Sequence, residues 1–200
     1  MRRQVKSQNS EIQQKGLVYP NNRTQIANIL FAEQKGFCAY TEEYIERTDA
    51  EDIEHFNPTL KGTDDDGYEN WFLVKHQWNS EKSTKWEECQ PILHPTADDF
   101  EERIVYTDGN YFANPEDKHA DNLIKLLNLN DQILTSNRKK FIKNKRDKFV
   151  QFGFDLTEHF TRKATEDPSS LKYLRAINEE FDVDVWSLIL TPNITTKKKR

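Results

Sequence analysis

An acid and a histidine side by side, with proline soon after, form the feature that most constrains this chain. In DIEHFNP, residues 52–58, the pattern predicts a β-strand that ends near His55 and is stopped by Pro58. Neighbouring side chains on a strand point to opposite faces, so Glu54 cannot simply steady His55 on one surface. If both side chains serve one site, the strand must end there or a large group must lie across its edge. A metal ion is such a group.

The segments that follow extend this strand into a longer pattern. Residues 57–69, NPTLKGTDDDGYE, are rich in turn-forming residues and predict a loop. The apolar run NWFLV at 70–74 predicts a second strand, and the polar segment from 76 opens a helix. The expected order is therefore strand, loop, strand and helix.

Helices are expected on both sides of this unit. The segment 24–35 has helical spacing, with Thr24 as the expected N-cap and Gly36 as the residue that ends it. Amphipathic patterns predict further helices over 116–129, from 131 to about 152, and within 169–190. The second half of the chain is thus expected to be mostly helical.

Four polar residues mark the ends of the central elements, and their order resembles that of the HNH endonucleases. In that family a ββα-metal unit uses an acid-histidine pair, a central Asn and a terminal Asn or His. The matching words are IEHFNP, NWFLV and WNSEK, and the residues are Glu54, His55, Asn70 and Asn79. The resemblance implies an α+β fold, with a nuclease core at 24–115, an N-terminal arm at 1–23 and a helical extension with a basic tail at 116–200.

The resemblance also implies a role for each residue. Phosphodiester hydrolysis needs a base for the attacking water and a cation for the charge on the leaving oxygen. His55 suits the base because an imidazole titrates near neutrality, and Asn70 would orient it by hydrogen bonding. Glu54 and Asn79 would then offer oxygen atoms to Mg²⁺, or to another divalent cation such as Mn²⁺.

One departure from the family concerns zinc. Many relatives carry a zinc knuckle, with one Cys pair before the catalytic strand and another before the last asparagine. Here Cys38 remains, Thr41 stands at the position of its mate, and Lys75 and Trp78 occupy the second pair. One thiolate cannot hold structural zinc, so none is expected. Other candidates have spacings that fit no standard motif: His76, Cys89 and His94. We expect aromatic packing instead, by Phe37, Tyr40, Trp71, Phe72 and Trp78.

Charge is unevenly distributed along the chain. The net charge of -5 hides a basic run at 138–148, RKKFIKNKRDK, and a basic end, KKKR. A basic helix follows a phosphate backbone or is simply a solvated face, and the sequence leaves both readings open. The candidate nucleic-acid contacts are Lys82, Lys139, Lys140, Lys143 and Lys145.

Within the HNH group, the chain resembles the nuclease subunit of Septu-type anti-phage systems, also found beside some retrons. The supporting words, within 24–148, are GFCAYTEEYI, IEHFNP, PILHPTADDFEERIVYTDGNYF and LIKLLNLND. The resemblance implies a defence effector with a neighbour-encoded ATPase, and a retron RNA or DNA element as a further partner. DNA is the favoured substrate, and structured RNA such as tRNA is the alternative.

A rival hypothesis is a non-catalytic subunit, in which a decayed HNH unit only binds the ATPase or nucleic acid. The intact acid, histidine and asparagines count against it. The chain has no apolar run of about 18 residues and its start lacks the apolar core of a signal peptide. Its two cysteines are too few for a disulfide scaffold, so we expect a cytoplasmic protein without membrane association.

Overall fold

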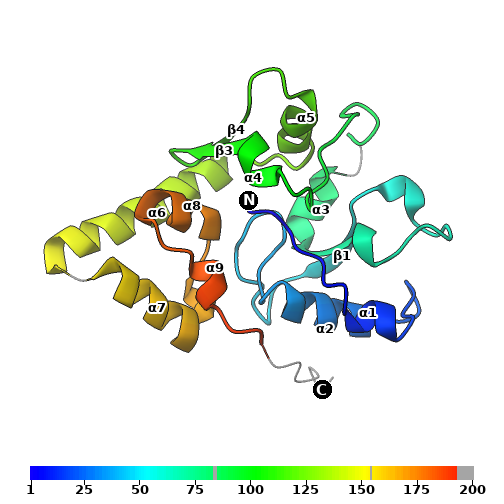
Figure 1. Ribbon diagram of the computed structural model, residues 1–200, viewed down its shortest axis with the longest axis horizontal. Coiled ribbons are helices and arrows are strands. Elements are labelled where there is room, and N and C mark those ends of the chain that lie inside the picture. Colours follow the sequence, from blue (N-terminus) through cyan, green and yellow to red (C-terminus); the bar gives the residue numbers. More distant parts are fainter. Residues whose placement is uncertain (83–84, 154, 193–200) are drawn as a thin grey trace.

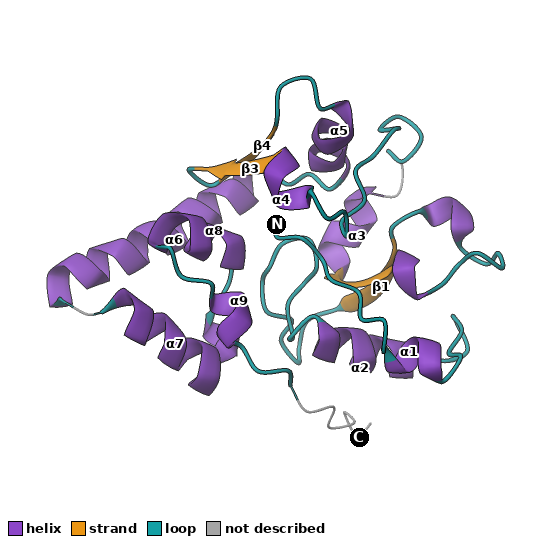
Figure 2. Ribbon diagram, viewed as in Figure 1, coloured by secondary structure: helices purple, strands orange, loops and turns teal. Residues whose placement is uncertain are grey.

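The computed structural model describes residues 1–82, 85–153 and 155–192, without the side chains of residues 80 and 81. It combines two small antiparallel sheets of two strands each with many helices (Figures 1 and 2). This mixed architecture is consistent with the expected α+β class. The elements are α1 (Glu11–Gln14), α2 (Arg23–Glu33), β1 (Glu51–His55), β2 (Trp71–Lys75), α3 (His76–Lys82), α4 (Phe100–Arg103), β3 (Ile104–Thr107), β4 (Asn110–Ala113), α5 (Lys118–Leu126), α6 (Gln132–Phe152), α7 (Leu156–Glu166), α8 (Leu174–Phe181) and α9 (Val185–Leu188).

The predicted strand, loop, strand and helix are confirmed as β1, β2 and α3. The two strands are antiparallel, with Glu54 opposite Phe72 and His55 opposite Trp71. Helices α2 and α3 both contact the two strands, which explains why β2 is apolar on both faces. Two 3₁₀ turns, Pro58–Leu60 and Tyr68–Asn70, begin and end the loop between the strands.

Helix α2 begins earlier than the sequence predicts. Asn22, rather than Thr24, is the N-cap, and no side-chain hydrogen bond closes this end. Gly36 follows the helix as expected, with a left-handed φ of +85°. A Cβ atom there would lie 2.5 Å from the ring of Tyr44, so the close packing of this turn requires glycine.

The segment 1–23, expected as an arm, lies against the rest of the protein. Met1 is buried, and its amino group is 3.4 Å from Glu42 Oε2. Lys6 donates to the carbonyl of Trp71, and its ammonium lies 4.1 Å from the ring centre of Phe72. In Figure 1 the N-terminus lies between the ββα unit and the helices of the second half. This segment is therefore a packed part of the fold.

The second half is mostly helical, as predicted. Helices α5 and α6 occupy the predicted segments, and α6 starts where Asp131 accepts hydrogen bonds from two backbone N–H groups, both at 2.9 Å. The last predicted helical segment is divided into α8 and α9 at Asp182, which is left-handed with φ +54°. The β3–β4 hairpin and α7 were not predicted, and the basic tail, 193–200, lies outside the described residues. None of the described helices is long and apolar enough to cross a membrane.

Candidate active site

Three of the four predicted site residues line one cavity at the end of β1. Glu54 and His55 come from the strand, and Asn79 comes from α3, which packs across it. The cavity has a volume of about 240 Å³. Its lining is Ile53, Glu54, His55, Pro58, Lys61, Asn79 and Lys82.

The imidazole of His55 is buried, and its burial favours the uncharged form. Its side chain is only 5% exposed and packs edge to face against the ring of Tyr19, with ring centres 4.6 Å apart. Burial lowers the pKa of His55 below its usual value, and the carboxylate of Asp66 opposes this only in part. The imidazole is therefore unprotonated at neutral pH, as a general base must be.

Asp66 is a site residue that the sequence did not single out. Its Oδ2 lies 3.1 Å from His55 Nε2, although the contact is not aligned as a hydrogen bond. A carboxylate can only accept, so its position favours the tautomer with the proton on Nε2. Among the described residues, Nδ1 has no hydrogen-bond partner, so this nitrogen is left to take a proton from water.

Asn70 acts on His55 through other residues. The direct hydrogen bond expected from the sequence is not what the structure shows. Asn70 Oδ1 accepts from the backbone N–H of Asn57 at 2.7 Å, and Nδ2 donates to the Asn57 carbonyl and to Asp66 Oδ1, both at 3.1 Å. Trp71 Nε1 also donates to Asp66 Oδ1, at 2.8 Å. Asn70 therefore fixes the turn after His55 and the carboxylate beside it.

Lys82 differs from the expected phosphate contact. Its side chain is 3% exposed, and Nζ binds Glu54 Oε1 and the carbonyls of His55 and Phe56. An ammonium has three N–H donors, and these three acceptors use them all. Lys61, whose side chain is exposed at the same cavity, is the lysine left to meet a phosphate.

The carboxylate of Glu54 is buried beside this lysine. Burial raises the pKa of Glu54, and the Lys82 ammonium opposes that rise. Lys82 itself has a pKa lowered by burial, with Glu54 acting in the opposite direction. The two groups therefore form an ion pair that neutralises the inner side of the cavity.

Asn79 is oriented by a second acid that the sequence did not single out. Its Nδ2 donates to Asp52 Oδ2 at 3.0 Å, which leaves Oδ1 as the free end of the amide. Asp52 lies two residues before Glu54 on β1, so both point to the same face of the strand. His76 Nδ1 is 2.6 Å from the same Asp52 oxygen and helps to hold it.

These donors fit a hard divalent cation. Mg²⁺ is usually bound by one or two protein carboxylates and completes its shell with water and phosphate oxygens. Glu54 and Asn79 provide one carboxylate and one amide oxygen in one cavity. In the described part of the chain, no three or more His, Cys, Asp or Glu side chains form a metal-binding group. The donor set therefore suits an ion that keeps much of its water.

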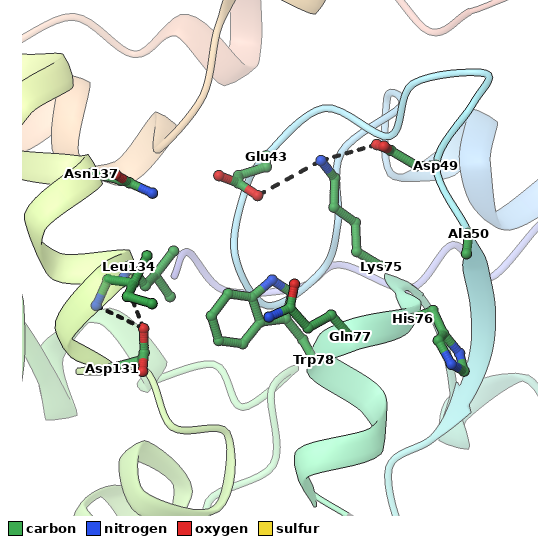
Figure 3. Close-up of a pocket in the computed structure, with 11 residues that line it drawn as sticks. Glu43, Asp49, Ala50, Lys75, His76, Gln77, Trp78, Asp131, Leu134 and Asn137 are labelled. Atoms are coloured by element: carbon green, nitrogen blue, oxygen red, sulfur yellow. Dashed lines mark hydrogen bonds and ion pairs between the residues drawn. The ribbon is translucent and has the colours of Figure 1, made fainter.

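The residues at the positions of the family's zinc knuckle include Cys38 and Lys75, and ion pairs of Lys75 lie at this place. A cavity of about 480 Å³ lies beside α6. Figure 3 shows Lys75 between the two acids Glu43 and Asp49 on its lining. Lys75 Nζ is 3.0 Å from Asp49 Oδ2 and 3.7 Å from Glu43 Oε2, and its backbone N–H donates to Cys38 Sγ at 3.5 Å. An ammonium ion thus joins the loop after Cys38 to β2.

Packing at this end matches the expectation from the sequence in part. Four of the five aromatic residues expected to replace the metal are buried, and Trp78 is half-buried in the wall of this cavity. The absence of zinc remains a prediction that elemental analysis of the purified protein will test. One tightly held zinc per chain would contradict it.

The basic helix α6 is partly neutralised. Lys139 is 2.7 Å from Asp108, Lys143 is 3.0 Å from Asp147, and Lys145 is half-buried with its ammonium 5.3 Å from the ring of Phe141. Lys140 is exposed. Figure 1 shows α6 running away from β1 and α3. Surface ion pairs of this kind are weak, so a phosphate contact by these lysines stays a prediction.

The comparisons with known proteins concern this same unit. No curated protein matches the chain. The model of a family described as HNH endonuclease matches residues 38–86, which include β1, β2, α3 and all four predicted site residues. The segment that builds the cavity is therefore similar to an HNH endonuclease.

Proposed function

We propose that the chain is a metal-dependent HNH endonuclease that hydrolyses phosphodiester bonds of nucleic acid. One observation carries the proposal: a neutral His55 shares a cavity with the oxygen donors of Glu54 and Asn79. This arrangement supports the proposal, because hydrolysis of a phosphodiester requires a base and a cation within one small space. The family match supports nuclease activity at the level of the family.

His55 performs the proton transfer in this mechanism. Nδ1 takes a proton of a water whose oxygen attacks phosphorus in line with the leaving oxygen. The bond from phosphorus to the leaving oxygen breaks as the new bond forms, and the leaving oxygen takes a proton from solvent. Asp66 stabilises the imidazolium that forms and keeps the ring in place through Nε2. A divalent cation held by Glu54 and Asn79 would supply positive charge to the leaving oxygen. Lys61, at the edge of the cavity, would bind a phosphate oxygen of the strand.

The test uses plasmid DNA and total RNA, each incubated with the protein in Mg²⁺ or in chelator. Cleavage that requires Mg²⁺ and is about 10²- to 10⁴-fold slower in His55→Gln is expected, because a general base contributes about this much. Glutamine keeps a polar, planar side chain in the space that His55 fills. Equal rates for the two proteins would remove His55 from the mechanism, and no cleavage of either substrate would favour a non-catalytic binding subunit.

A metal titration separates the two roles. Asn79→Ala should need more Mg²⁺ for half-maximal cleavage, because it removes one of few protein ligands. His55→Gln should stay inactive at every Mg²⁺ concentration, since no metal replaces the base. Rescue of both variants by excess metal would show that Asn79 and His55 do not have different roles.

The finer assignment as a cytoplasmic, Septu-like defence effector rests on the sequence words given above. We infer a neighbour-encoded ATPase as the partner, a retron element as a further one, DNA as the favoured substrate and structured RNA as the alternative. Co-expression with the adjacent ATPase, followed by purification on a C-terminal tag, tests the pairing. Elution of the nuclease without the ATPase would contradict it.

A further inference from the structure

A second cavity lies on the other side of the turn Pro58–Leu60 from the catalytic cavity. Pro58 lines the catalytic cavity, whereas Asn57 and Leu60 line this one. Its volume of about 550 Å³ is within the range of small-molecule sites. The lining comprises Gln13, Phe56, Asn57, Leu60, Asp65, Gly67, Tyr68, Glu69, Asn70, Trp86, Gln90, Ile92 and His94.

The two cavities share a wall. The ammonium of Lys82, which lines the catalytic cavity, is 5.1 Å from the ring centre of Phe56 and 5.4 Å from that of Trp86. Both rings line the second cavity. Asn70, which fixes the turn after His55, lines it as well. A group bound here would therefore lie beside the catalytic cavity.

The wall of this cavity is aromatic. Phe56 and Trp86 pack edge to face with ring centres 5.4 Å apart, and Phe56 packs in the same way against His94 at 4.8 Å. Tyr68 and Ile92 add further apolar surface. Aromatic rings of this kind bind flat, unsaturated rings by stacking.

The polar groups of the cavity suit a neutral ligand with amino groups. Asp65 and Glu69 are exposed carboxylates on its lining, and no lysine or arginine is among the described lining residues. The backbone N–H of Thr96 donates to His94 Nδ1 at 3.3 Å, and burial lowers the pKa of His94 to about 4. His94 is therefore neutral, with its proton on Nε2. The carboxylates of Asp65 and Glu69 would repel a phosphate here, whereas they would accept a hydrogen bond from an exocyclic amino group.

We propose that this cavity binds one nucleobase of the strand that is cut, next to the scissile phosphate, with a preference for bases that carry an exocyclic amino group. This inference rests on the proposed function. Adenine, cytosine and guanine have such a group, and thymine and uracil do not. Trp86 provides the stacking surface, and Asp65 and Glu69 accept from the amino group.

The first experiment scans a single abasic site along an oligonucleotide that the protein cleaves. Trp86→Ala should lower kcat/KM by about 5- to 160-fold, because removal of one base-stacking interaction costs about 1–3 kcal/mol. An abasic site at the pocket position should lower kcat/KM of the wild-type protein by a similar factor. It should not lower kcat/KM of Trp86→Ala any further. Trp86→Phe should restore most of the rate. Trp186→Ala, on α9 and outside both cavities, is the matched control and should leave the rate unchanged. Independent, additive effects of the variant and the abasic site would overturn the proposal.

The second experiment does not depend on the fold of the Trp86 variants. Asp65→Asn combined with Glu69→Gln changes two exposed side chains, so this protein is expected to fold normally. It should lose the preference for cytosine over uracil or thymine at the pocket position. An unchanged preference would show that the carboxylates do not read the base.

Binding separates failure of this inference from failure of the proposed function. Fluorescence anisotropy of the same oligonucleotides, measured in chelator, reports base binding without cleavage. If the protein cuts nothing but its binding depends on the base and this dependence is lost in Trp86→Ala, the base-binding cavity is supported and the nuclease function is rejected. If the protein cleaves at the same rate whatever the base at every position, the nuclease function is supported and base binding in this cavity is rejected.

Discussion

Removal of the Lys82 ammonium should strongly destabilise the protein, because it leaves the buried carboxylate of Glu54 without a counter-ion. The two side chains are 3% and 7% exposed, so water does not replace the missing partner. Breaking one side of such a buried pair costs about 3–5 kcal/mol. Lys82→Met is the suitable change because methionine keeps an unbranched side chain as far as Cε and lacks only the charged end.

Urea unfolding followed by tryptophan fluorescence measures this cost. Lys85→Met, three residues later and exposed, is the matched control and should shift the free energy of unfolding by less than about 0.5 kcal/mol. The double variant Glu54→Gln, Lys82→Met should be more stable than Lys82→Met alone, because no buried charge is left unpaired. A cost below about 1 kcal/mol for Lys82→Met would refute the buried ion pair.

The pH dependence of this cost has a definite sign. Burial already raises the pKa of Glu54, and loss of Lys82 removes the charge that opposes the rise. The folded Lys82→Met protein then binds more protons than its unfolded chain, so its stability falls as pH rises from the unfolded pKa through the raised folded pKa. Lowering the pH toward 4.5 should therefore reduce the cost. Added Mg²⁺ should stabilise Lys82→Met more than the wild type, because a bound cation replaces the ammonium. A cost that is constant with pH would contradict this explanation.

Three other predictions concern the base, a helix cap and the basic helix. Asp66→Asn should slow cleavage and move the acid limb of the pH-rate profile to lower pH, because the Asp66 carboxylate raises the pKa of His55. A slower rate without this movement would mean that Asp66 has a purely structural role. Asp117, which caps α5 and binds Arg103 at 2.7 and 2.8 Å, has a pKa lowered by that contact to about 2. In urea unfolding, Asp117→Asn should cost about 1 kcal/mol at pH 7, after allowance for solvent screening, and this difference should vanish as pH falls from 3.8 through about 2. For the basic helix, one variant replaces four lysines of α6 by Gln: Lys139, Lys140, Lys143 and Lys145. Each of these lysines that binds a phosphate should contribute about 0.9 to the slope of log affinity against log salt on duplex DNA, so the slope should fall by that amount for each one removed. The control variant replaces Lys118 and Lys125 of α5 and should leave the slope unchanged.

The sequence predicts the ββα unit well because each of its signals is local. Strand periodicity, turn residues and the order of the four polar residues define β1, β2 and α3 without knowledge of the rest of the chain. The acids that hold the site are different. Asp66 is one of three consecutive aspartates, and nothing in the run 64–66 indicates which of them meets His55. Asp52 likewise looks like one more acid in an acidic segment until α3 packs against it.

The buried position of Lys82 was missed for a related reason. A lysine just after a predicted metal ligand is a reasonable phosphate contact when only the sequence is known. Its burial follows from the packing of α3 across the end of β1, which places its ammonium at Glu54 and two carbonyls. The hairpin β3–β4 was missed for a different reason: its strands are only four residues long and few of their residues are buried, so the alternation is too brief to read.

The ββα unit is closed at both ends by lysine ammonium groups that bind carboxylates. Lys75 joins Asp49 and Glu43 at the end that contains Cys38 and Thr41, and Lys82 binds Glu54 at the end that contains His55. A thiolate-zinc site holds its loops by coordination bonds, whereas the ion pairs of Lys75, whose side chain is 22% exposed, are partly screened by salt. The two ends should therefore differ: salt should loosen the loop after Cys38, while the buried pair at Glu54 should hold. The position of His55 then depends on the inner contacts, from Asn57 and Asn70 to Asp66, more than on the end where zinc would lie.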